Sequence, residues 1–146
     1  MKLRVDKQDA ALVLALEGEL DVDGSVELEE RCLYEQQEGA RHFVFSLSAV
    51  TQITGPGLRV LLGLARSLPR SGGSLVLCEL EQRVEEALRV SGLDGAFVTA
   101  PSRAAALERS REIQSARREE QLANGSEAQQ RIDLAIALLG SAERPR

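Results

Sequence analysis

A strand, a polar turn and a helix follow one another between His42 and Leu68, where the chain reads HFVFSLSAVTQITGPGLRVLLGLARSL. The apolar run from Phe43 to Leu47 predicts a buried strand, and Pro56 is suited to the first position of the amphipathic helix that follows. A strand that feeds directly into a helix favours an α/β fold. The free amides and the positive end of the helix then meet the carboxyl end of the strand, so this turn is the predicted working surface.

Strands and helices alternate along the rest of the chain. Residues 3–5 and 11–20 predict two strands joined by a polar turn, and a helix follows to about Glu38. The later pattern predicts a strand over 74–80, a short helix ended by Gly92, a strand over 96–99 and a helix from Arg103. This order predicts a small, mostly parallel sheet with helices packed on it, in a domain spanning residues 1–110.

Residues 111–146 predict a C-terminal helical extension. Its first part is nearly all polar, and Asn124-Gly125 predicts a break in the helix. Ser126 and Gln129 form a capping-box pattern that predicts a new helix from Glu127 to Leu139, with an apolar stripe along one side. That stripe is expected either to fold back onto the sheet or to pair two chains as a homodimer.

Composition limits the classes of function. The chain has 146 residues, 43% of them hydrophobic and only 3% aromatic, and a formal net charge of -5. Few aromatic rings and an acidic balance argue against nucleic-acid binding. The N-terminal residues lack an apolar signal region and no apolar run reaches membrane-spanning length, so we expect a cytoplasmic protein without membrane insertion.

A compact acidic block precedes and opens the first predicted helix, with no basic residue inside it. Two interpretations stay open, a solvated rim and helix face or a docking surface for a basic partner. The block consists of Glu17, Glu19, Asp21, Asp23, Glu27, Glu29 and Glu30.

The motifs of catalysis and cofactor binding are absent from the sequence. Gly55-Pro56-Gly57 begins like a dinucleotide loop, but Val60 occupies the third glycine position and Pro56 removes an amide. His42 is the only histidine, and Cys32 and Cys78 form no CxxC pair and read as buried apolar residues. We therefore expect no catalytic residues, no cofactor and no metal site.

Four segments together resemble the STAS domain, which sulfate transporters share with anti-sigma factor antagonists. LEGELDV over residues 16–22 is similar to the family's G-x-L-D signature, and FVFSLSAV over residues 43–50 to its central strand. ITGPGL over residues 53–58 is similar to I-D-S-S-G-L, and VEEALRVSGLDGAFV over residues 84–98 to the family's last helix-strand unit. The resemblance covers residues 1–110.

The resemblance implies a non-catalytic bacterial regulator of transcription that works by partner switching, as an anti-sigma factor antagonist does. Its partner would be an anti-sigma factor or a kinase-like regulatory protein. The residues expected to bind that partner are Asp21, Asp23, Thr54, Gly55, Pro56, Gly57 and Leu58.

The family's regulatory serine is missing from this chain. In relatives of this type, phosphorylation of a serine at the start of the central helix ends partner binding, since phosphate adds charge and bulk to the interface. Here Gly55 occupies that position, Thr54 replaces an aspartate, and Ser46 replaces the aspartate of the preceding strand. Gly55 is the predicted N-cap of the helix. Thr54 remains open as plain turn chemistry or as a substitute phosphorylation site.

Two other functions within the resemblance stay open. One is a STAS subunit of a lipid-transport ATPase or of a stress-signalling complex. The other is a nucleotide-binding STAS domain that uses the free amides near Gly55, against which Pro56 and the missing lysine argue.

Overall fold

The computed structural model describes residues 1–142, without the side chains of residues 124, 126 and 140–142. The described residues divide into two compact units, residues 1–111 and residues 112 onward. The elements, in chain order, are β1 (Lys2–Lys7), β2 (Leu12–Leu20), α1 (Val22–Gln37), β3 (His42–Ile53), α2 (Gly55–Arg70), β4 (Ser74–Cys78), α3 (Gln82–Val90), a 3-10 turn η1 (Asp94–Ala96), β5 (Val98–Ala100) and α4 (Arg103–Ala142).

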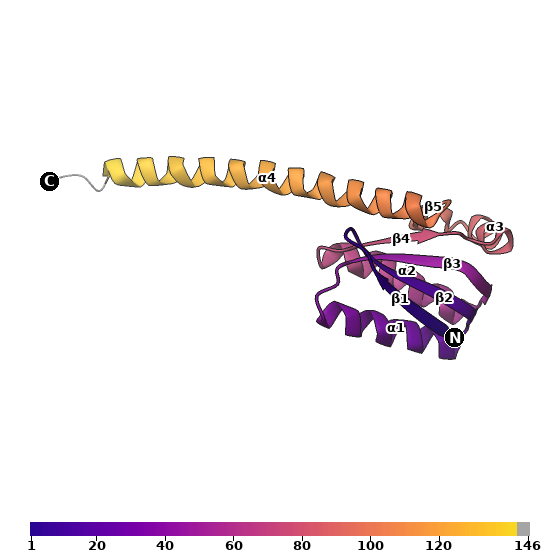
Figure 1. The fold of residues 1–146 in the computed structure, drawn as a ribbon. Helices are drawn as coiled ribbons and strands as arrows, with labels where there is room; N and C mark the ends of the chain where they lie inside the picture. Colours follow the sequence, from indigo (N-terminus) through magenta and orange to yellow (C-terminus); the bar gives the residue numbers. More distant parts are fainter. Residues whose placement is uncertain (143–146) are drawn as a thin grey trace. The chain divides into compact units, whose positions relative to one another are not determined.

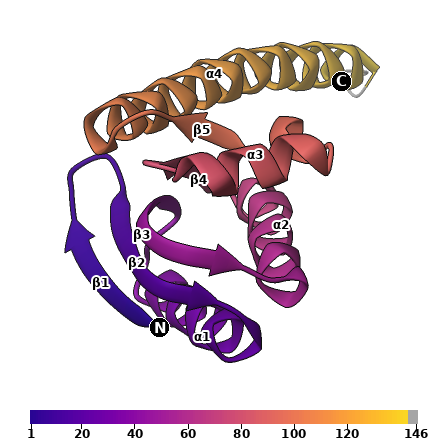
Figure 2. The ribbon, with the colours of Figure 1, turned by 90° about the vertical axis from the view of Figure 1, so that its right-hand side faces the viewer.

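The first unit is built on a five-stranded sheet whose strands lie in the order β1-β2-β3-β4-β5 (Figure 2). β1 and β2 form the antiparallel opening hairpin, and every later neighbour pairs in parallel. The predicted fold class, a small and mostly parallel sheet with packed helices, is therefore confirmed.

The central strands bury residues on both faces of the sheet. The main core lies on the face that α1 and α2 cover (Figure 1), and it includes Leu14, Phe45 and Leu77. On the opposite face, Val13, Val44 and Val76 stand in register on neighbouring strands and are fully buried. Burial on both faces explains why these strands read as continuous apolar runs.

The helices follow from the spacing of their apolar residues. α1 buries Leu28 and Cys32 on one stripe, and α2 buries Leu61, Leu64 and Leu68 at intervals of three and four. Both helices begin directly after a strand and pack against each other. Their N-termini therefore lie side by side at the carboxyl ends of β2 and β3.

β3 is longer than the sequence predicted. It continues past Leu47 to Ile53, and its second half pairs with the end of β2. Only Val50 is fully buried in this second half, and the neighbouring residues 48, 49, 51 and 52 are exposed. A strand with a single buried residue at its end gives no clear alternation in the sequence, so its length was underestimated.

The predicted break at Asn124-Gly125 is wrong. α4 runs without interruption from Arg103 to Ala142, and the predicted helix from Glu127 to Leu139 is its distal part. The Ser126 and Gln129 pattern therefore starts no helix. A glycine inside a helix costs only about 1 kcal/mol relative to alanine, so it weakens a helix without ending it.

Candidate partner-binding site

Thr54 begins α2 as its N-cap. The Thr54 Oγ1 accepts a hydrogen bond from the Gly57 amide at 3.5 Å and donates one to the Leu20 carbonyl at 3.2 Å. The Thr54 amide donates to the same carbonyl at 3.0 Å. The Leu20 carbonyl, at the end of β2, therefore anchors the start of α2 to the neighbouring strand.

The predicted N-cap at Gly55 is thus displaced by one residue. Gly55 is the first residue of α2 and Pro56 the second. A residue before proline usually avoids helical geometry because its Cβ meets the proline ring, but glycine has no Cβ. Threonine, which supplies a hydroxyl acceptor, takes the cap position instead.

Gly57 is the position where the packing leaves no room. A Cβ built there would lie 2.1 Å from the Leu20 carbonyl oxygen and 2.9 Å from Leu20 Cγ. Gly57 is buried, so it sets the distance between α2 and β2 rather than presenting a side chain. At Gly55, by contrast, the nearest atom to a built Cβ outside the two neighbouring residues is Arg59 Nη2 at 3.9 Å, and the residue is exposed.

Asp21 caps α1 just as Thr54 caps α2. Its Oδ1 accepts from the Gly24 amide at 2.9 Å, and its carbonyl accepts from the Ser25 amide at 2.8 Å. Leu20 and Ile53, the last residues of β2 and β3, are register partners. The sheet therefore brings Asp21 and residues 54–58 together at the carboxyl ends of these two strands. Asp23 is exposed in the first turn of α1.

The acidic block lies almost wholly at the surface. Asp21 is half-buried and the other six carboxylates are exposed. Glu27 lies 3.6 Å from the N-terminal ammonium group. Val22 and Val26, on α1 among these acids, are 59% and 52% exposed. Acidic and apolar side chains therefore both contribute to the exposed surface of α1.

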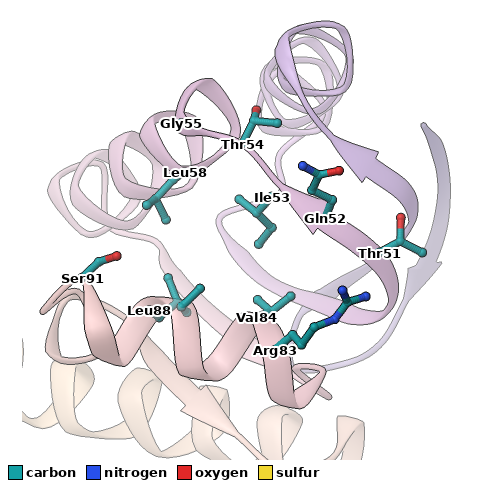
Figure 3. A pocket seen from close by; sticks show the side chains of 11 residues that line it. Thr51, Gln52, Ile53, Thr54, Gly55, Leu58, Arg83, Val84, Leu88 and Ser91 are labelled. Carbon is teal, nitrogen blue, oxygen red and sulfur yellow. The ribbon is translucent and has the colours of Figure 1, made fainter.

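A cavity that the sequence did not predict lies next to the start of α2. It encloses about 300 Å³ between residues 51–54 and α3, and Figure 3 shows Leu58, Val84 and Leu88 pointing into it with Arg83 at its rim. Val84 and Leu88 are four residues apart on α3, so the sequence shows only an ordinary core stripe. No signal in the sequence distinguishes residues that line a cavity from residues that fill a core.

The single histidine is hydrogen-bonded and the two cysteines are buried. His42 Nδ1 lies 2.8 Å from Ser74 Oγ, near the start of β3 and far along the strand from Thr54. Burial raises the pKa of the Cys32 thiol to about 12 and that of the Cys78 thiol to about 11, so neither thiol is activated. Within the described residues, no three histidine, cysteine or acidic side chains gather as metal ligands.

The fold is that of a small α/β domain in which α1 and α2 begin at the carboxyl ends of β2 and β3. Residues 2–106 match the family model described as "STAS domain", so the chain belongs to the STAS family, as the resemblance implied. No helix within residues 1–142 combines the length and apolar character that crossing a membrane requires.

Among relatives, the chain is 38% identical over 106 residues to BtrV of Bordetella bronchiseptica, a protein named as a candidate anti-sigma factor antagonist. The match covers 73% of this chain and 91% of BtrV. An anti-sigma factor antagonist from Mycobacterium paratuberculosis has the same fold, with a TM-score of 0.67, 24% identity, and coverage of 75% of this chain and 93% of that one. Unphosphorylated SpoIIAA, an anti-sigma factor antagonist, gives a TM-score of 0.63 at 20% identity, covering 76% and 97%.

Proposed function

We propose that this chain is an anti-sigma factor antagonist that binds an anti-sigma factor or a kinase-like regulatory protein and so controls transcription. The relatives named above support the class of partner. The observation that carries the proposal is that the two helix N-termini lie side by side, which brings Asp21, Asp23 and residues 54–58 together with Asp23 and Gly55 exposed. Gly57 contributes by holding α2 close to β2, and Pro56 and Leu58 contribute half-buried surface.

We further propose that the chain lacks the phosphorylation switch. Gly55 has no hydroxyl, and the Thr54 hydroxyl is occupied by the Leu20 carbonyl and the Gly57 amide. Phosphorylation of Thr54 would remove the hydroxyl hydrogen that the Leu20 carbonyl accepts and would place a negatively charged group beside that carbonyl oxygen. Plain turn chemistry therefore explains Thr54, and partner binding is expected to persist in the presence of ATP.

A serine placed at residue 55 tests the proposal. Gly55→Ser is combined with Pro56→Ser, because a Cβ at residue 55 would meet the Pro56 ring in helical geometry; outside the neighbouring residues, the nearest atom to the new Cβ is Arg59 Nη2 at 3.9 Å. With purified anti-sigma kinases of the host bacterium and ATP, the variant should gain phosphate at residue 55 and lose binding, and the natural chain should keep both its mass and its binding. Gly63→Ser, on the exposed middle of α2 with open space around it, is the matched control. Phosphate on residues 51–58 of the natural chain would refute the missing switch, and failure of every kinase to bind would refute the function.

The distal part of α4 supports a further proposal, a homodimer formed through residues 127–139. Ile132, Ile136 and Leu139 are spaced by four and three residues, as in a helix-pairing seam, and are 52%, 62% and 60% exposed. In the full chain, Ile132→Glu combined with Ile136→Glu should reduce the mass measured by light scattering from that of a dimer to that of a monomer. Arg131→Glu, outside the seam, is the control. A monomeric natural chain would refute the pairing.

We also propose that the chain acts in the cytoplasm, by protein contact alone. The STAS family of anti-sigma factor antagonists is generally non-enzymatic, which agrees with the structural roles of His42, Cys32 and Cys78. The acidic net charge of -5 and the scarcity of aromatic residues support the absence of nucleic-acid binding.

A further inference from the structure

The second half of β3 has a free edge. Residues 43–46 pair with β2 on one side and β4 on the other, but beyond Ser46 only β2 continues beside the strand. β4 ends at Cys78, and Glu79, with φ of +57°, turns the chain toward α3. Within the described residues, no strand pairs with the other edge of residues 48–53. In a parallel sheet alternate residues point their amide and carbonyl groups to each side, so part of this backbone faces an unpaired edge.

The cavity described above adjoins this free edge. Residues 51–54 form one wall, and α3 forms the opposite wall (Figure 3). Ile53 and Leu58 line it from one side, and Val84 and Leu88 line it from the other. Thr51 and Gln52, next to the cavity, are exposed. A volume of about 300 Å³ accommodates a large apolar side chain carried by a neighbouring strand.

The charge at the cavity favours an acidic occupant. Of the described residues that line it, Arg83 is the one that carries a charge, and its side chain is exposed. The positive end of α2 opens onto the same cavity at Thr54 and Gly55. The acidic block belongs to β2 and α1 and does not line the cavity.

We propose that an extended segment of the partner protein binds at this edge as an additional strand beside residues 48–53. Backbone hydrogen bonds hold the segment, one of its apolar side chains enters the cavity, and a neighbouring carboxylate pairs with Arg83. This mode of binding rests on the proposed function only for the identity of the protein that supplies the segment. The chemistry of the segment, extended and apolar with an adjacent acidic residue, follows from the site itself.

Peptide selection tests the binding mode without any anti-sigma factor. Random peptides of about eight residues, displayed on phage and selected on the full chain, should converge on alternating apolar residues with an adjacent aspartate or glutamate. In amide hydrogen exchange, a selected peptide should protect the amides of residues 48–53. Methylation of every second peptide amide should weaken binding about tenfold. Selection without enrichment, or enriched peptides insensitive to methylation, would overturn the proposal and leave the proposed function standing.

Two pairs of exposed variants locate the peptide. Ala87→Trp fills the cavity from α3 and should weaken binding at least tenfold, whereas Glu86→Trp, on the adjacent residue outside the cavity, should not. Arg83→Glu should weaken binding of acidic peptides, and Arg89→Glu, outside the cavity on the same helix, is its control. Unchanged binding by Ala87→Trp would overturn the proposal. So would a dimer of the natural chain that Ala87→Trp dissociates, because the occupant would then be a second copy.

Discussion

Gly57→Ala should destabilise the first unit, although alanine favours helices more than glycine does. The new methyl group would lie 2.1 Å from the Leu20 carbonyl oxygen, so α2 must move away from β2. That movement weakens the two hydrogen bonds by which Thr54 reaches this oxygen, each of which contributes about 1 kcal/mol. Overpacking costs a further ~1–3 kcal/mol, and the higher helix propensity of alanine offsets about 1 kcal/mol of this loss.

The expected net loss is about 2–4 kcal/mol in the free energy of unfolding, measured by urea denaturation followed by circular dichroism. Gly63→Ala is the matched control, because Gly63 lies exposed in the same helix with nothing within 4 Å of a built Cβ. It should stabilise the chain by up to about 1 kcal/mol. If the two variants had equal stability, the close approach of α2 to Leu20 would not be a real constraint on this fold.

Two more outcomes follow from the same part of the chain and from its core. Thr54→Val removes the hydroxyl that caps α2 and should cost about 1 kcal/mol in urea denaturation, whereas Thr54→Ser should keep most of that stability; equal losses would contradict the cap. Since burial raises the pKa of Cys32 from 9.0 to about 12, the folded state disfavours the thiolate, and stability should fall as pH rises above about 9. Cys32→Ala should flatten this fall in alkaline urea titrations, and an unchanged slope would contradict it.

The order of strands and helices could be predicted from the sequence because each element has a short apolar period bounded by turn residues. The hairpin, the three strand–helix units and the start of α4 were all located in this way. Such local patterns carry no information on how far a half-exposed strand continues. The end of β3 at Ile53 depends on pairing with β2, which is a tertiary contact.

The candidate site was only partly predictable. Asp21 and residues 54–58 stand out in the sequence, and the parallel topology implies that the strands before them end side by side. The one-residue shift of the N-cap from Gly55 to Thr54 depends on bonds to Leu20, 34 residues earlier. The cavity beside α3 depends on how helix and strand diverge after Cys78, for which Val84 and Leu88 give no separate signal.

The uninterrupted α4 illustrates the limit of reading glycine as a stop. Asn124-Gly125 and the following Ser126 form a reasonable local signal for a helix end, yet the helix continues through all three. Local preferences of about 1 kcal/mol are small beside the accumulated preference of a long run of alanine, glutamate, arginine and leucine.

Gly55 and Gly57, two residues apart at the start of α2, are subject to different constraints. The close approach of α2 to β2 depends on Gly57, whereas a side chain at residue 55 would meet only the tip of Arg59 and the ring of Pro56. A chain with serine at residue 55 would therefore also need a residue other than proline at position 56. Two neighbouring positions, rather than one, separate this helix start from one that carries a hydroxyl group.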